Sequence, residues 1–211
     1  MEQRQADGGQ SMGLRERKRR ATRDAIERAA IALVSERGYD NVTVAQICEL
    51  SSVSQGTFFN YFPTKDAAIV GLGRVDLDAG VVHAAYDRIE GTPYHATLTL
   101  FLKVVRDLDW TSEIAAMRAR LVAQTPALMK LFLDGTFGFV SDFRGILAAY
   151  LERHPERRSC PDELTPSEEA GLVVAEALEA AKFALARATA DPDASLPDAA
   201  EVEAVVRRIV G

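Results

Sequence analysis

The feature that most constrains this fold is a pair of helix-capping signals that lie close together. Thr43-Val44-Ala45-Gln46 is a capping-box pattern, in which the Thr hydroxyl and the Gln side chain each satisfy an unpaired backbone amide at a helix start. Ser54 is a second N-cap residue. We therefore expect one short helix over residues 44–50 and another over 55–61. The Ser51-Ser52 segment leaves room only for a tight turn, and two helices so joined form a helix-turn-helix.

A longer amphipathic helix precedes this motif. Its apolar residues recur at the spacing of one helix face and are Ile26, Ala29, Ala30, Leu33 and Val34, and Gly38 is placed to end it. Within the motif, Ile47, Val53, Phe58 and Phe62 are spaced to face this helix, whereas Gln55, Gly56, Phe59 and Asn60 face away. No charged residue lies between Glu49 and Lys65, so nothing on the second short helix would repel a phosphate backbone.

Charge is unevenly distributed. The chain has 211 residues, 25 of them basic and 31 acidic, so its net charge is −6. Division after Asp66 gives 10 − 9 = +1 for the first part and 15 − 22 = −7 for the rest. Six basic residues crowd into one segment, namely Arg15, Arg17, Lys18, Arg19, Arg20 and Arg23. This segment is either a phosphate-binding arm or a solvated helix start.

The rest of the chain has helical periodicity and no strand pattern of useful length. Six further helices are expected, over about 65–89, 98–108, 114–121, 126–154, 167–189 and 199–210. Gly135, Gly138 and Gly145 favour a kink or break in the fourth of these. The prediction is an all-α chain of about nine helices, with a disordered tail (1–13), a helix-turn-helix domain (14–64) and a helical C-terminal domain (65–211).

Several functional classes lack support in the sequence. The histidines are scattered, no glycine-rich phosphate motif occurs, and Cys48 and Cys160 have no metal-binding spacing, so we expect no enzyme, no metal and no cofactor. No apolar segment is long enough to cross a membrane, and the cysteine usage suits the cytoplasm. Cys48 is either a small buried residue or a redox sensor.

The helix-turn-helix segment resembles that of a known protein family. The run Val53-Ser54-x-Gly56-Thr57-Phe58-Phe59-x-Tyr61-Phe62-x-x-Lys65, after Gly38-Tyr39 and the capped helix, is similar to the DNA-binding domain of the tetracycline-repressor (TetR) family of bacterial transcriptional regulators. The resemblance covers about 45 residues, from Thr22 to Asp66. It implies that the second short helix enters the major groove of double-stranded DNA.

The resemblance also implies which residues contact DNA. The base-reading residues would be Gln55, Gly56, Thr57 and Asn60, and the phosphate contacts Thr43, Tyr61 and Lys65. The expected DNA-binding set adds Arg19 and Arg20 of the basic segment, Ser54 and Phe59. Many relatives have Ala-Gly where this chain has Ser51-Ser52, which requires Ser52 to tolerate a positive φ, and many have Tyr in place of Phe59, which here offers only apolar contact.

Family members bind palindromic operators as dimers, so the resemblance implies a homodimer. The expected interface lies on the last two helices and comprises Val174, Leu178, Ala181, Leu185, Val202, Val206 and Ile209. The alternative is that these residues form the core within one chain.

The resemblance further implies an apolar effector pocket in the C-terminal domain. Its expected lining comprises Tyr86, Phe101, Trp110, Met117, Leu121, Phe132, Phe137 and Phe183, although an aromatic residue in such helices is more often part of the core. The resemblance thus implies a repressor that a small hydrophobic effector releases from DNA. The alternatives are a regulator that senses redox state through Cys48, a ligand-binding module without operator specificity, and an activator.

Overall fold

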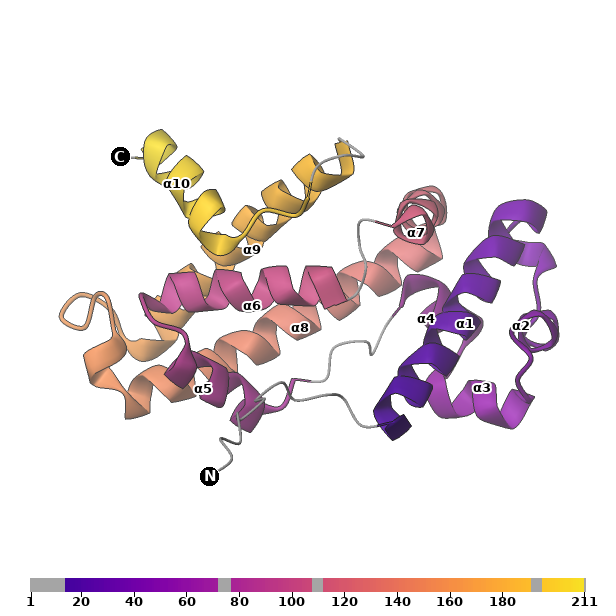
Figure 1. The fold of residues 1–211 in the computed structure, drawn as a ribbon, viewed down its shortest axis with the longest axis horizontal. Helices are drawn as coiled ribbons and strands as arrows, with labels where there is room; N and C mark the ends of the chain where they lie inside the picture. Colours follow the sequence, from indigo (N-terminus) through magenta and orange to yellow (C-terminus); the bar gives the residue numbers. More distant parts are fainter. Residues whose placement is uncertain (1–13, 72–76, 108–111, 191–194, 211) are drawn as a thin grey trace, which may run out of the picture. The chain divides into compact units, whose positions relative to one another are not determined.

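The computed structural model describes residues 14–71, 77–107, 112–190 and 195–210, and these are all helix, turn or loop without a strand. The chain divides into two compact units, Met1–Ile69 and Val70–Gly211. Figure 1 labels the ten α-helices that the described residues form. The all-α prediction is therefore confirmed, and the expected tail at 1–13 lies outside the described residues.

The N-terminal unit is built on a long first helix. It contains α1 (Leu14–Arg37), the 3-10 turn η1 (Tyr39–Asn41), α2 (Val44–Ser51), α3 (Gln55–Tyr61) and α4 (Lys65–Val70). Gly38 ends α1 with φ +82, a conformation that glycine adopts without a steric penalty. The core of the unit is apolar and includes Ile26, Ala30, Val34, Ile47, Phe58, Phe62 and Ile69. The inward face predicted for the motif is thus buried, except that Val53 is only half-buried.

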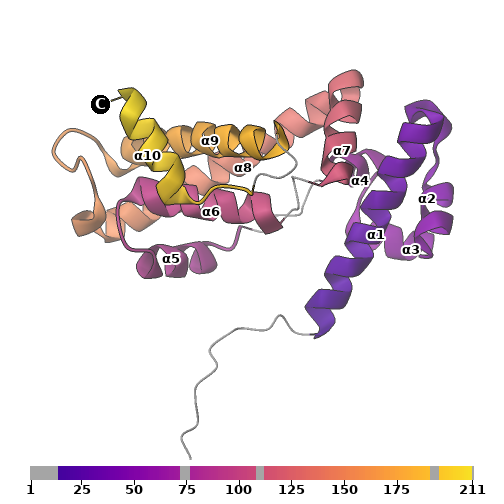
Figure 2. The ribbon, with the colours of Figure 1, turned by 45° about the horizontal axis from the view of Figure 1, so that its top comes forward.

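The C-terminal unit is a layered bundle. It contains α5 (Ala79–Arg88), α6 (Pro93–Asp107), α7 (Glu113–Gln124), α8 (Pro126–Arg153), the 3-10 turn η2 (Pro155–Arg157), α9 (Pro166–Ala190) and α10 (Ala199–Val210). Helices α6 and α8 both pack against α9, as Figure 2 shows from a second side, and α10 packs on α6 and α9. The core combines the aromatic residues of α5, α6 and α8 with alanines of α9.

Two predictions about the helices need correction. The single helix expected over 65–89 is two helices, α4 and α5, because Gly71 takes a φ of +79 directly after Val70 and ends the first one. In contrast, α8 runs without a break from Pro126 to Arg153 through all three of its glycines. The loop expected around Asp191-Pro192 lies outside the described residues.

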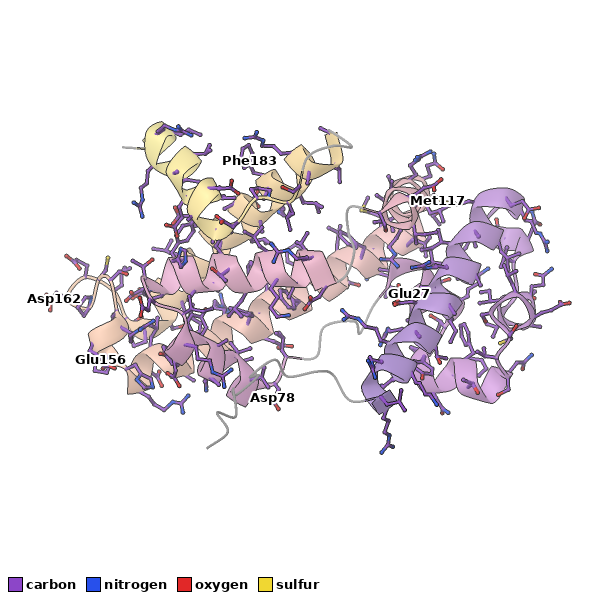
Figure 3. The ribbon with its side chains drawn as sticks, in the orientation of Figure 1. Glu27, Asp78, Met117, Glu156, Asp162 and Phe183 are labelled. Atoms are coloured by element: carbon purple, nitrogen blue, oxygen red, sulfur yellow. The ribbon has the colours of Figure 1, made fainter. Side chains whose placement is uncertain are left out.

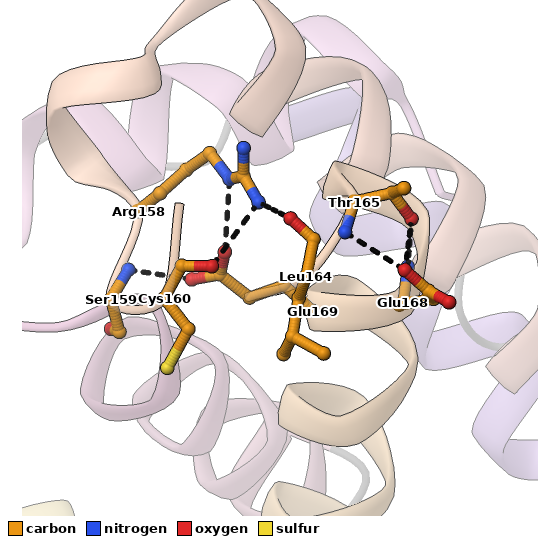
Figure 4. Close-up of polar contacts among 7 residues, drawn as sticks. All are labelled: Arg158, Ser159, Cys160, Leu164, Thr165, Glu168 and Glu169. Atoms are coloured by element: carbon orange, nitrogen blue, oxygen red, sulfur yellow. Dashed lines mark hydrogen bonds and ion pairs between the residues drawn. The ribbon is translucent and has the colours of Figure 1, made fainter. Parts of the chain in front are cut away.

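A buried ion pair orders the predicted loop between α8 and α9 (Figure 4). Arg158 Nε donates to Glu169 Oε2 at 2.9 Å, and the Ser159 amide donates to Glu169 Oε1 at 2.6 Å. The Arg158 guanidinium also donates to the carbonyl oxygen of Leu164. Thr165 and Glu168 then form a capping box at the start of α9. Side chains rather than regular structure therefore fix this loop.

Candidate nucleic-acid interface

The capping box predicted for α2 is present. The Thr43 amide donates to Gln46 Oε1 at 2.9 Å, and the Gln46 amide donates to Thr43 Oγ1 at 3.4 Å. Thr43 is exposed, as a phosphate contact requires. The box determines where α2 begins and leaves the first turn of that helix at the surface.

The turn between α2 and α3 depends on a serine in the left-handed region. Ser52 has φ 57 and ψ 39, and its amide donates to the carbonyl oxygens of Cys48 and Glu49. Ser51 Oγ donates to the carbonyl oxygen of Ile47 at 2.6 Å. The positive φ expected at Ser52 is confirmed, and these hydrogen bonds offset the steric penalty that a residue with a Cβ pays there, of order 1 kcal/mol.

Helix α3 has one buried and one exposed side. Ser54 Oγ caps it by accepting from the Thr57 amide at 3.0 Å. Phe58 is 0% exposed, whereas the next residue, Phe59, is 53% exposed. The two rings meet edge to face, with their centres 5.4 Å apart. Gln55, Gly56 and Asn60 are exposed as well, while Thr57 and Tyr61 are half-buried. The structure thus places the predicted base-reading residues on one short, uncharged surface helix.

Lys65, which was predicted to contact a phosphate, bonds within its own unit. Its Nζ donates to the carbonyl oxygens of Tyr39 at 2.8 Å and Val42 at 3.0 Å, and lies 4.2 Å from the centre of the Tyr39 ring. Tyr39 Oη donates to Asp66 Oδ1 at 2.9 Å. Burial, followed by this hydrogen bond and the charge of Asp66, raises the pKa of Tyr39 to about 12. Neither Tyr39 nor Asp66 was predicted as a site residue, because these contacts join Tyr39 to residues 26 and 27 positions away in the sequence.

The basic segment forms the first turns of α1 rather than a separate arm. Arg17, Lys18 and Arg19 are exposed on this helix and Arg20 is half-buried. Arg23 belongs to the packing of the unit, because its Nε lies 3.4 Å from Glu27 Oε1 and its guanidinium lies 4.6 Å from the centre of the Phe62 ring. The outer part of the segment is therefore the part that presents positive charge.

Two of the expected pocket residues are core residues in this conformation. Tyr86 is buried, donates or accepts a hydrogen bond with Thr97 Oγ1 and stacks on Tyr150 at 5.0 Å. Phe101 is buried against Phe143, with ring centres 4.9 Å apart.

The other expected pocket residues divide into two groups. Met117, Leu121 and Phe132 are half-buried, and Trp110 lies outside the described residues. Phe137 on α8 and Phe183 on α9 are 69% and 41% exposed, so they line no enclosed pocket in this conformation; Figure 3 labels Phe183 and Met117.

The expected interface residues also divide. Val174, Ala181 and Val202 are buried within this chain, which corresponds to the core alternative rather than to a surface. The other members of that set are half-buried, namely Leu178, Leu185 and Val206, and Ile209 is exposed. The alanine-rich face of α9 therefore packs inside the chain.

Other chemistry is weakly supported. Cys48 is buried, and burial raises the pKa of its thiol, which lowers the population of the reactive thiolate. Among the described residues, no three side chains of His, Cys, Asp or Glu are grouped so that they could hold a metal ion. None of the helices described is long and apolar enough to span a membrane.

Comparison with known proteins supports the resemblance. Residues 26–69 match the family described as bacterial regulatory proteins, tetR family. The transcriptional regulator TcmR of Streptomyces glaucescens is 35% identical over 130 residues, which cover 57% of this chain and 56% of TcmR. The regulator RutR of Escherichia coli K12 is 27% identical over 143 residues, 66% of each protein. The matches thus span less than two thirds of either relative.

A solved structure extends the similarity in fold. NalD, the secondary repressor of the MexAB-OprM multidrug efflux pump in Pseudomonas aeruginosa, superposes with a TM-score of 0.52 at 22% identity, over 90% of this chain and 96% of NalD. At this identity the match concerns the fold alone.

Proposed function

We propose that this chain, whose residues 26–69 match the tetR family of bacterial regulatory proteins, is a repressor that binds a palindromic operator as a dimer and leaves it when a small hydrophobic effector binds. The observation that carries the proposal is the surface of α3. It is capped, exposed on one side and free of charged residues. Such a helix can enter a DNA groove without bringing a carboxylate close to the phosphates.

The side chains on α3 suit the edges of A·T base pairs. The amides of Gln55 and Asn60 can pair with N6 and N7 of adenine, and the Thr57 methyl can contact the thymine methyl group. Gly56 has no side chain to keep DNA away from the helix, and the position is open, since an added Cβ would have only Ser54 Oγ nearby, at 3.8 Å. The α3 surface therefore supplies the base-specific part of binding.

Phosphate contacts would orient this helix. Thr43 at the start of α2, Tyr61 at the end of α3, and Arg19 and Arg20 on α1 supply hydroxyl and cationic donors on the same unit as the recognition helix. Contacts of this type hold the protein in register on DNA without selecting a sequence. Ser54 acts through the cap that it forms, and Phe59 through apolar contact.

Exposed apolar side chains on α8 and α9 support a dimer interface there. Leu133 and Phe137 project from α8, and Leu172 and Phe183 from α9. A Cβ added at Gly138 of α8 would meet no atom within 4 Å, so the surface there has no partner within the described chain. Exposed aromatic and leucine side chains beside small residues suit a self-complementary contact. We propose these outer faces in place of the buried Val174, Ala181 and Val202.

The half-buried apolar residues of the C-terminal unit support the proposal that the effector is hydrophobic. Met117 and Leu121 on α7 and Phe132 on α8 keep accessible apolar surface, and these two helices pack against each other. A ligand that binds one arrangement of this unit better than another would change the population of the DNA-binding form.

The test of DNA reading is the substitution Gln55→Ala. DNA selected from a random pool by the variant should lose preference at one base pair in each half-site, where the wild-type protein discriminates by about 1–3 kcal/mol. Gln124→Ala, the same substitution on the exposed end of α7, is the control and should select the wild-type sequence. Identical selection by all three proteins would contradict base reading by α3, and absence of any selection would favour a ligand-binding module without operator specificity.

A further inference from the structure

We infer that Lys65 is a positioning residue for DNA binding, which holds the loop of residues 38–42 in front of α2, and that a phosphate contact is not its main role. The inference rests on the proposed DNA-binding function. It assigns to Lys65, together with Tyr39, a task that acts through Thr43.

The surroundings of the ammonium group support this role. An ammonium has three N–H donors, and two of those of Lys65 are bonded to the carbonyl oxygens of Tyr39 and Val42. The Tyr39 ring lies against the same nitrogen at 4.2 Å and adds a cation–π contact. The side chain is half-buried. Two of the three donors and the side of the ammonium that faces the Tyr39 ring are therefore already engaged within the protein.

The loop that Lys65 holds leads directly into the capping box. Its two acceptor carbonyls belong to the first residue of η1 and to Val42, the residue before Thr43. Val42 is buried, so the end of the loop is fixed against the core. The position of Thr43 at the protein surface therefore depends on the peptide groups that Lys65 binds.

The same loop is held from two further directions. The Tyr39 hydroxyl donates to Asp66, which follows Lys65 on α4, and Asn41 Nδ2 donates to the carbonyl oxygen of Arg37 at 2.7 Å. Lys65 and Asp66, in the first turn of α4, thus contact the ring, the carbonyl oxygen and the hydroxyl group of Tyr39. Loss of either Lys65 or the Tyr39 side chain should release the loop.

Salt dependence separates the two roles of a lysine. A lysine that binds a phosphate releases a counterion, so its removal lowers the slope of log K against log salt concentration by about one. A lysine that positions a loop lowers the affinity at every salt concentration and leaves this slope unchanged. A second variant that keeps the Lys65 charge but releases the loop should then have the same effect.

The experiment uses the full chain and a duplex carrying the sequence that this chain selects from random DNA. Lys65→Met removes the ammonium, Tyr39→Leu removes the ring and its hydroxyl but leaves the charge, and Lys130→Met, at an exposed i,i+4 pair on α8, is the control. Binding is measured over a salt series, and amide hydrogen exchange of residues 39–46 is followed by mass spectrometry.

We expect Lys65→Met and Tyr39→Leu each to weaken binding about tenfold or more, the range for loss of a hydrogen bond to a charged group, with the wild-type salt slope. Exchange in residues 39–46 should accelerate in both, and Lys130→Met should match wild type. The inference is overturned if Lys65→Met lowers the slope by about one while Tyr39→Leu binds and exchanges like wild type. Failure of the wild-type chain to bind any duplex would instead refute the proposed function, and the exchange data would still test the loop contacts.

Discussion

The two units of this chain achieve their structure in different ways. The N-terminal unit depends on local side-chain caps, in which Thr43 and Ser54 each bond to a backbone amide three residues later and fix where a short helix begins. The C-terminal unit depends on long helices whose contacts join residues far apart in sequence, with α9 packed against both α6 and α8. Short helices that carry a recognition surface need their ends fixed, whereas long helices gain stability from the apolar surface that they bury.

The comparison is tested most strongly by two neighbouring phenylalanines on α3. Phe58→Ala removes a fully buried ring and should lower the free energy of unfolding of the N-terminal unit by about 3–5 kcal/mol. Phe59→Ala removes an exposed ring and should change stability little while it weakens DNA binding. Urea unfolding and DNA titration of both variants measure the difference, and equal losses of stability would show that the exposed side of α3 is not reserved for a ligand.

In the C-terminal unit, the corresponding test is the ion pair between Arg158 and Glu169. Both side chains are largely buried, so Arg158→Ala leaves a carboxylate without its main partner and should lower stability by about 3 kcal/mol. The exposed pair of Lys182 and Glu179 is the control, since Lys182→Ala should change stability by less than about 1 kcal/mol. Thermal unfolding of the Arg158→Ala and Lys182→Ala variants measures the two stability losses. Similar small effects would mean that the loop before α9 needs no ion pair.

Alkaline pH should affect the Tyr39 contacts. Because folding raises the pKa of Tyr39 from 10.0 to about 12, the stabilisation that it represents is complete below pH 10 and is lost as the pH rises toward about 12. The wild-type chain should therefore lose more stability than Tyr39→Phe over this range, by a modest amount because Tyr39 is partly exposed to solvent. Chemical unfolding at several pH values provides the measurement, and parallel pH profiles would contradict the assigned environment of this hydroxyl.

The smallest expected changes in stability come from substitutions of two glycines. Gly138 lies within α8 with open space around it, so Gly138→Ala should stabilise the monomer by about 0.5–1 kcal/mol. Gly38 has φ +82, and Gly38→Ala should destabilise the N-terminal unit by about 1 kcal/mol. Melting temperatures of the two variants should therefore shift in opposite directions. A destabilising Gly138→Ala would show that α8 is packed more closely there than the described chain indicates.

Local signals made the N-terminal unit predictable from sequence. Helix α2 begins at the expected residue and ends one residue later than expected, and α3 has the expected bounds, because a cap involves residues only three apart. The helix expected over 65–89 was wrong because its apolar spacing continues past Gly71, and the spacing alone does not show where the backbone takes a positive φ.

Long-range contacts were not predictable in the same way. The contact of Lys65 with Tyr39 joins residues far apart in sequence, and the family resemblance suggested a phosphate for that lysine instead. Helix α9 has small residues on several faces, so the sequence could not distinguish the face buried against α6 and α8 from the face left exposed. Val174 and Ala181 were therefore expected at a dimer interface although they lie in the core of the chain.

The most direct test of the central claim is selection of DNA from a random-sequence pool by the purified full chain, with sequencing of the bound fraction. The claim is that α3 presents a base-reading surface and that two copies act together on DNA. It predicts enrichment of a two-fold symmetric sequence whose half-sites lie one or more helical turns apart, about 34–36 Å per turn. A bound fraction with the same base frequencies as the starting pool at every position would contradict it.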